Sequence, residues 1–136
     1  MFVLCKRNMT SMDTRKKKVL CVDDSPGILS LCKELLEDNG FEVFIAADGK
    51  AALELLTQHL HDIGVAVIDN EIPGITGLLL AETIKKSAPT VAVLMFSGLP
   101  PDESASSPWI DSVLNKEAGI PALLGVVRYL AGIDKN

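Results

Sequence analysis

Hydrophobic and polar residues follow one another along the chain in blocks of two different periods. Five blocks are six to eight residues long, mostly apolar and rich in Val and Ile, which is typical of strands buried on both faces. The predicted strands are 18–23 (KVLCVD), 41–46 (FEVFIA), 64–69 (GVAVID), 90–97 (TVAVLMFS) and 110–115 (IDSVLN). Other segments between and after them have apolar residues at helical spacing, so the pattern predicts strands and helices in alternation.

Polar residues suited to helix N-caps mark where three of the helices begin: Ser25 (followed by Pro26), Asp48 and Thr76. The four predicted helices run from 26 to about 38, from 49 to about 58, from 77 to before Pro89, and from 118 to 131. In the first helix the apolar stripe consists of Ile28, Leu31, Cys32, Leu35 and Leu36. This stripe predicts the face that packs on the sheet.

Two connections break the alternation. Residues 72–77 (IPGITG) predict a turn, and residues 98–108 (GLPPDESASSP) predict a loop with at most a short helix. Five strands alternating with helices predict an α/β fold, in which a five-stranded parallel sheet is doubly wound by helices on both faces.

Length and composition limit the function classes. A chain of 136 residues predicts one domain, and 48% hydrophobic with only 4% aromatic residues predicts an aliphatic core. We expect a flexible leader at 1–16, the domain at 17–132 and a short tail at 133–136. The net charge of −5 argues against direct nucleic acid binding. The basic run Arg15–Lys18 reads as a solvated leader, with a patch for an acidic partner as the alternative.

The cysteines and the apolar runs point to a cytoplasmic protein. Cys5, Cys21 and Cys32 lack metal-ligand spacing, and the last two read as small core residues of a reduced protein. The apolar runs are far shorter than the roughly 20 residues of a membrane helix, so we expect no membrane insertion.

Several polar residues stand at the ends of the predicted strands. In parallel sheets functional residues gather at the carboxyl ends of strands. Taken alone, each polar residue at a strand end has an ordinary interpretation, as a helix cap, a turn residue or an exposed lysine. Asp23 and Asp24 also precede a helix start. The strand ends carry Asp23-Asp24, Asp69, Ser97 and Lys116. Taken together, they predict one site at one edge of the sheet.

The residue types limit the chemistry of such a site. Carboxylates a few ångströms apart repel by roughly 1–4 kcal/mol per pair, so three of them favour a bound cation. A hard divalent ion such as Mg²⁺ takes oxygen ligands and bridges carboxylates to phosphate. A lysine and a hydroxyl suit phosphoryl oxygens, and an aspartate can accept a phosphoryl group as a nucleophile.

From about Lys17 to Ala131 the chain resembles the receiver domain of two-component response regulators, which has a flavodoxin-like fold. The motifs that carry the resemblance are VDDSP, IDNEIPGITG, MFSG and NKE. The resemblance implies that Asp69 is the phosphoacceptor, Ser97 the switch hydroxyl and Lys116 the phosphoryl contact. It implies that Mg²⁺ binds to Asp24 directly and to Asp23 through water, with Asp69 and the backbone carbonyl of Glu71 as further ligands.

The resemblance also implies the partners. The phosphoryl donor would be a histidine kinase or a histidine phosphotransfer protein, and the output would go to a downstream protein target, with a weak homodimer as a further expectation. We expect a signalling module rather than an enzyme, either a single-domain regulator or a receiver from a longer protein. The alternatives are a pseudo-receiver, which would interact independently of phosphorylation, and a hydrolase with an aspartyl-phosphate intermediate.

Two positions depart from the family pattern. Glu117 follows Lys116 where members usually have proline, and Val113 stands where an aromatic switch residue is usual. The family's lysine–proline bond is typically cis, but a cis bond before Glu117 would cost roughly 2.5–4 kcal/mol. We therefore predict a trans bond, a displaced first turn of the last helix, and Lys116 close to Asp69 by a different route.

Overall fold

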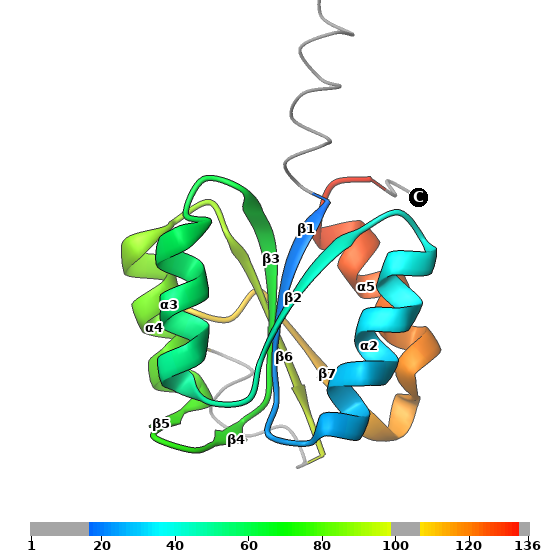
Figure 1. Ribbon diagram of the computed structural model, residues 1–136, viewed down its shortest axis with the longest axis horizontal. Helices are drawn as coiled ribbons and strands as arrows, with labels where there is room; N and C mark the ends of the chain where they lie inside the picture. Colours follow the sequence, from blue (N-terminus) through cyan, green and yellow to red (C-terminus); the bar gives the residue numbers. More distant parts are fainter. Residues whose placement is uncertain (1–16, 99–106, 134–136) are drawn as a thin grey trace, which may run out of the picture.

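A computed structural model of the chain describes residues 17–98 and 107–133. Five parallel strands form one sheet in the order β2-β1-β3-β6-β7 (Figure 1). The strands are β1 (Lys18–Val22), β2 (Glu42–Ala46), β3 (Ile63–Ile68), β6 (Ala92–Ser97) and β7 (Ser112–Asn115). The predicted five-stranded parallel sheet is therefore confirmed.

Helices cover both faces of the sheet. In Figure 1, α2 (Pro26–Asp38) and α5 (Ile120–Leu130) lie on the right, while α3 (Gly49–Gln58) and α4 (Gly77–Ser87) lie on the left. The doubly wound prediction is confirmed. The predicted leader, most of the proline-rich loop and the end of the chain lie outside the described residues, so the limits of the domain stay a prediction.

The three predicted N-caps form as the sequence indicates. The side chain of Ser25 accepts a hydrogen bond from the N–H of Ile28 at 3.4 Å. Asp48 caps α3 at 2.8 Å from the nitrogen of Ala51. Thr76 caps α4 through the N–H of Leu79. Each cap satisfies one backbone donor that the helix itself leaves free.

The core consists of two aliphatic layers, one on each side of the sheet. The layer under α3 and α4 includes Ile68, Leu80 and Ile84, all fully buried. The layer under α2 and α5 includes Leu36 and Leu123. Cys21 and Cys32 are buried free thiols in the second layer, as predicted.

The apolar stripe of α2 differs from the predicted one at Leu31. Leu31 is 50% exposed, whereas Leu29 is 6% exposed and packs with Cys32 and Leu36. Spacings of three and four residues put Leu29, Cys32 and Leu36 on one face. Leu31 therefore points away from the sheet, and its assignment to the buried stripe is wrong.

The segment IPGITG is more than a turn. Glu71–Ile72 (β4) and Ile75–Thr76 (β5) pair antiparallel as a small separate hairpin. Gly74 lies at its tip with φ of 87°, a conformation that favours glycine. The hairpin lies at the carboxyl edge of the main sheet, below α3 and α4 in Figure 1.

The end of the sheet departs from the predicted boundaries. β7 begins at Ser112 rather than Ile110, and α5 begins at Ile120 rather than Ala118. A 3₁₀ helix, Lys116–Ala118, fills the gap. No cis peptide bond occurs among the described residues, so the predicted trans bond after Lys116 is confirmed. The displacement of the first turn of the last helix relative to other family members stays a prediction.

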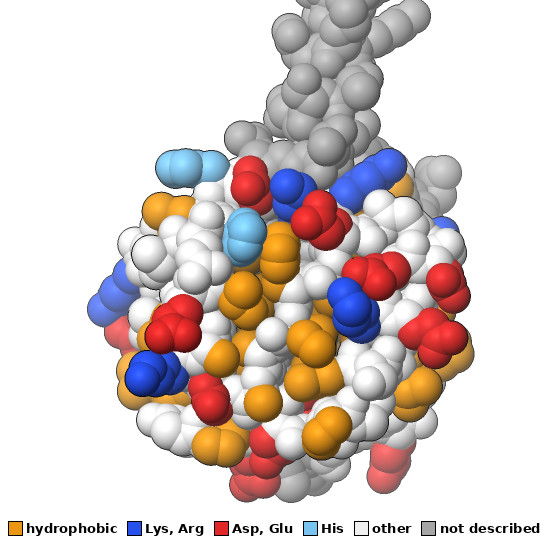
Figure 2. All heavy atoms as spheres, in the orientation of Figure 1, with side chains coloured by type: hydrophobic (Ala, Val, Ile, Leu, Met, Phe, Trp, Pro, Cys, Tyr) orange, Lys and Arg blue, Asp and Glu red, His pale blue; other side chains and the backbone are white. Residues whose placement is uncertain are grey.

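The surface carries charges of both signs. Figure 2 shows acidic and basic side chains interspersed around the rim, with hydrophobic side chains gathered where β2 passes in front. Ile45 of this edge strand is 42% exposed. No described helix is long and apolar enough to cross a membrane.

Candidate functional site

The fold brings the predicted residues to one edge of the sheet. Asp23 follows β1, Asp69 follows β3, Ser97 ends β6 and Lys116 follows β7. The chain runs outward from β1 to β2 and, on the other side, from β3 to β6, so the order of the strands reverses between β1 and β3. Ligands of open α/β sheets bind at such a reversal point.

Three carboxylates converge at this point. Asp23, Asp24 and Asp69 each offer one oxygen atom, and these oxygens all lie within 4.8 Å of one another. Asp23 and Asp69 are buried while Asp24 is exposed, so the cluster opens to solvent on the Asp24 side. The donor set consists of oxygen atoms, which fits a hard divalent cation such as Mg²⁺.

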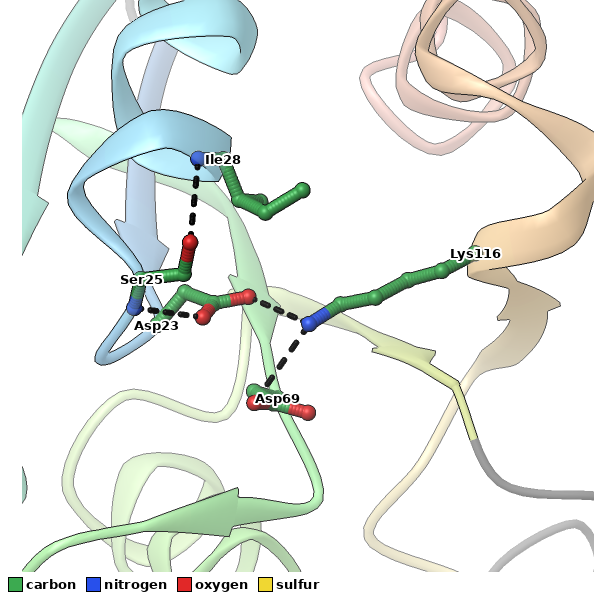
Figure 3. A network of polar contacts seen from close by, with 5 residues as sticks. All are labelled: Asp23, Ser25, Ile28, Asp69 and Lys116. Carbon is green, nitrogen blue, oxygen red and sulfur yellow. Dashed lines mark hydrogen bonds and ion pairs between the residues drawn. The ribbon is translucent and has the colours of Figure 1, made fainter.

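Lys116 reaches across the edge of the sheet to two of these carboxylates (Figure 3). Its Nζ lies 2.7 Å from Oδ2 of Asp23 and 3.5 Å from Oδ2 of Asp69. The same ammonium lies 6.0 Å from the centre of the Phe96 ring, within reach of a cation–π contact. One cation of the chain thus partly balances the acidic cluster.

The electrostatics of Asp69 disfavour its charge. Burial raises the pKa of the Asp69 carboxyl, and the negative charge of Asp23 raises it further. Lys116 and the backbone N–H groups of Asn70 and Glu71 act in the opposite direction, and burial and Asp23 outweigh them.

Burial and the same acidic neighbours also shift the pKa of Lys116. Burial acts to lower the pKa of its ammonium group. The hydrogen bond to Asp23 and the charges of Asp23 and Asp69 outweigh burial, so the pKa of Lys116 is raised. The lysine is therefore firmly protonated in the folded protein.

Asp23 makes a turn contact and an ion pair at the same time. Oδ1 of Asp23 accepts a hydrogen bond from the N–H of Ser25 at 2.9 Å, which is a turn contact at the start of α2 (Figure 3). The other oxygen of Asp23 holds Lys116. Ser25 caps the helix, which leaves the carboxylate of Asp24 to the acidic cluster.

The remaining two predicted residues lie at the same edge. Ser97 is 6% exposed and is paired in register with Asn115 across β6 and β7. Glu71 is exposed in β4, and its N–H is hydrogen-bonded to Asp69. A hollow of about 540 Å³ lies beside the acids, lined by Asp24, Asn70, Glu71, Ile72, Pro73, Gly74, Ile75 and Thr76.

Sequence reasoning missed Gly77 as a residue of the site. Its N–H donates to the carbonyl oxygen of Asn70 at 2.9 Å, and a Cβ at this position would lie 2.4 Å from the carbonyl oxygen of Asp69. The start of α4 thus lies directly against the backbone that carries Asp69. The available signal was a glycine immediately after the N-cap Thr76.

The fold and the site together define a flavodoxin-like α/β domain with an acidic pocket and a lysine at the carboxyl edge of its sheet. The profile of the response regulator receiver domain matches residues 19–126. The chain belongs to this family.

The chain is similar to a sensor protein and to two solved proteins named for response regulators. Sensor protein GacS of Pseudomonas syringae pv. syringae is 31% identical over 130 residues, which are 90% of this chain and 14% of GacS. A receiver domain protein of Clostridium thermocellum is 27% identical, with a TM-score of 0.78 over 85% of this chain and 94% of that one. Response regulator TrrA of Thermotoga maritima, solved with Mg²⁺ and BeF, is 28% identical. Its TM-score is 0.73, and the match covers 83% of this chain and 97% of TrrA.

Proposed function

We propose that the domain accepts a phosphoryl group on Asp69 with the help of Mg²⁺ and thereby switches its interactions with other proteins. The observation that carries this proposal is the cluster of three carboxylates with Lys116 between two of them. Asp23, Asp24 and Asp69, together with the backbone carbonyl of Glu71, would hold the metal. When bound, Mg²⁺ neutralises charge on the carboxylates and on the incoming phosphoryl oxygens.

The transfer is a displacement at phosphorus. A carboxylate oxygen of Asp69 attacks the phosphorus of a phosphohistidine, the new P–O bond forms, and the P–N bond breaks with its electron pair returning to the imidazole. Lys116 contacts the phosphoryl oxygens and offsets their charge. The backbone N–H groups of Asn70 and Glu71 orient the Asp69 carboxylate for the attack.

Ser97 is the switch hydroxyl of this proposal. It is buried at the end of β6, on the strand next to β3, which Asp69 follows. A phosphoryl group on Asp69 would attract its hydroxyl and shift the end of β6. Val113, which replaces the usual aromatic switch residue, packs at the edge of the layer under α3 and α4. The proposed conformational change therefore reaches the target-binding surface without the participation of an aromatic side chain at position 113.

The donor is proposed to be a histidine kinase or a histidine phosphotransfer protein. GacS, a similar protein, is named as a sensor protein, and the matched part is only 14% of its length. The described surface mixes acidic and basic side chains, which suits protein partners rather than nucleic acid (Figure 2). The two described cysteines are free thiols, which agrees with the proposed cytoplasmic location.

The pseudo-receiver alternative is not favoured, because the acids and the lysine that phosphorylation needs are all present and close together. A hydrolase is a different kind of function and has a simple test. Steady turnover of p-nitrophenyl phosphate with Mg²⁺ would show an enzyme, whereas a signalling receiver should show none above the rate of Asp69→Asn.

The proposal is tested by phosphorylation in vitro. Incubation with acetyl phosphate and Mg²⁺ should add one phosphoryl mass to the wild-type protein and none to Asp69→Asn, which keeps the shape of the side chain but removes the nucleophilic carboxylate. Asp38→Asn is the matched control, because Asp38 is an exposed acid at the far end of α2.

Two results would contradict the proposal. One is modification that persists in Asp69→Asn, which would assign the phosphoryl group to another residue. The other is a wild-type protein that is folded, as judged by its thermal melt, but neither gains mass nor binds beryllofluoride in Mg²⁺. Omission of Mg²⁺ should abolish both signals in the wild type.

A further inference from the structure

The segment that carries Lys116 is held by a side chain outside the acidic cluster. Asn115 ends β7 and is the N-cap of the 3₁₀ helix Lys116–Ala118. Its side-chain Oδ1 accepts a hydrogen bond from the N–H of Glu117 at 2.7 Å. This contact closes a tight turn around Lys116, since it joins the residue before the lysine to the residue after it.

A second hydrogen bond fixes the C-terminal end of this turn. The carbonyl oxygen of Lys116 accepts a hydrogen bond from the N–H of Gly119 at 3.0 Å. Gly119 has φ of 90°, a conformation that favours glycine, and it leads the chain directly into α5. The backbone of Lys116 is therefore bracketed by two hydrogen bonds between the end of β7 and the start of α5.

The direction of this backbone decides where the lysine points. Lys116 is a long, flexible side chain with high rotamer entropy, so a single ion pair orients it weakly unless its starting point is fixed. From this starting point its Nζ meets Asp23 at 2.7 Å and Asp69 at 3.5 Å (Figure 3). The ring of Phe96, 6.0 Å from the ammonium, supports the side chain along the way but does not hold the backbone.

We infer that Asn115 is a positioning residue, whose side-chain oxygen aims Lys116 at the acidic cluster by holding the N–H of Glu117. The hydrogen bond needs a donor at position 117, which glutamate supplies and proline would lack. Asn115 does not belong to the acidic cluster of Asp23, Asp24 and Asp69, and it acts on that cluster only through Lys116. Its effect on phosphoryl chemistry rests on the proposed function, whereas its effect on the lysine does not.

The first measurement observes Lys116 directly, by NMR of its ¹⁵N-labelled ammonium group at fixed pH without metal. In the wild type the group should give an ordered signal, assigned by its loss in Lys116→Met. Asn115→Ala removes the acceptor, and Asn115→Gln keeps the amide but moves it by one methylene. Both variants should lose the ordered signal, and the melting temperature of each checks that it is folded.

Two further variants are the matched controls. Asn115→Ser keeps a neutral acceptor of similar N-cap strength and should restore the ordered signal. Glu117→Ala keeps the donated N–H and changes only an exposed side chain, so the lysine signal should stay as in the wild type. A role of Asn115 in general stability would lower the melting temperature without this selective pattern.

The second measurement concerns phosphoryl binding and uses beryllofluoride with Mg²⁺. Asn115→Ala and Asn115→Gln should weaken its binding by about two- to tenfold, the equilibrium equivalent of one net hydrogen bond. Asn115→Ser and Glu117→Ala should bind as the wild type does. If the wild type itself fails to bind, the proposed function fails, and the NMR measurement still decides the role of Asn115.

The inference is overturned if Asn115→Ala and Asn115→Gln keep the wild-type ammonium signal. It is equally overturned if Glu117→Ala loses that signal, because the side chain of Glu117 rather than its N–H would then hold the turn. Should Asn115→Ala fail to fold, the comparison of Asn115→Gln with Asn115→Ser decides the question with the same readout.

Discussion

The surroundings of Asp69 act on the pKa of its carboxyl in opposite directions. Burial and the neighbouring Asp23 raise the pKa of its carboxyl, while Lys116 and two backbone N–H groups lower it. The net effect is a carboxylate whose charge is unfavourable in the folded, metal-free protein. Such a group gains from any cation that enters the pocket, which agrees with a metal-assisted phosphoacceptor.

This imbalance predicts a pH-dependent difference in stability between wild type and Asp69→Asn without metal. Because the folded-state pKa of Asp69 is raised, the folded protein holds the proton more tightly than the unfolded chain. The corresponding stability is present below the unfolded pKa and is lost as pH rises through the folded pKa. Asp69→Asn lacks this loss, so its stability relative to wild type should rise as the pH increases above the ordinary Asp pKa of about 4.

Urea denaturation of both proteins in EDTA across this range measures the difference. Other titrating groups are common to both proteins and cancel from it, apart from those coupled to Asp69 itself. A difference that stays flat would mean that folding leaves the pKa of Asp69 unchanged, and one that falls with rising pH would mean that the carboxylate is stabilised in the metal-free pocket.

At the scale of elements, the hairpin β4–β5 and the start of α4 hold the loop after β3 in place. Gly49, at the start of α3, leaves room for the side chain of Ile75 and donates its N–H to the carbonyl of Pro73 at 3.3 Å. Gly77 lies against the backbone of Asp69 and Asn70. Two close approaches thus fix the backbone that presents Asp69.

Gly77→Ala is expected to destabilise the protein, because the added Cβ would meet backbone atoms, at 2.4 Å from the Asp69 oxygen and 2.9 Å from Cα of Asn70. Such overpacking costs roughly 1–3 kcal/mol. Gly125→Ala is the matched control, since Gly125 is exposed within α5 and has no atom within 4 Å of an added Cβ. It should stabilise the protein by about 0.5–1 kcal/mol.

Thermal and urea denaturation of both variants test this contrast. Gly77→Ala should also weaken beryllofluoride binding, because the loop that carries Asp69 must shift to admit the methyl group. Equal stability of Gly77→Ala and wild type would show that the start of α4 yields without cost.

At the scale of the whole molecule, the reversal of strand order between β1 and β3 brings charged and polar residues together at one edge of the sheet. Four residues from separate strand ends meet there, three of them acids or hydroxyls that are buried: Asp23, Asp69 and Ser97. Lys116 comes from the far side of the sheet, two strands away from β3. If this edge binds a cation as proposed, the stability of the fold should depend on the cation concentration.

Melting curves with and without Mg²⁺ should show this linkage. In the wild type, Mg²⁺ at ten times its dissociation constant should add about 1.4 kcal/mol of stability. Asp24→Ala should lose most of this gain, while its stability without metal stays level or rises, because one repelling carboxylate is gone. Asp38→Ala, at an exposed acid far from the cluster, should keep the full Mg²⁺ effect. Equal gains in Asp24→Ala and wild type would place the metal elsewhere.

The sequence by itself determined the order and type of the main elements and indicated the polar residues of the candidate site, but not Gly77. The periods of apolar residues are set by backbone geometry over a few residues, so strands and helices could be predicted from them. The caps Ser25, Asp48 and Thr76 are equally local, because each side chain bonds an N–H three residues on. The topology of alternating elements then put Asp23, Asp69 and Lys116 at one edge.

Only the tertiary structure decided which contacts these residues make. Leu31 and Leu29 are equally apolar, and the placement of α2 on the sheet buries one and exposes the other. The stronger contact of Lys116 with Asp23 than with Asp69 depends on how the turn at Asn115 leaves the sheet. These outcomes involve residues up to 93 positions apart in the chain. Their geometry follows from packing of the whole domain, which no local pattern of residues contains.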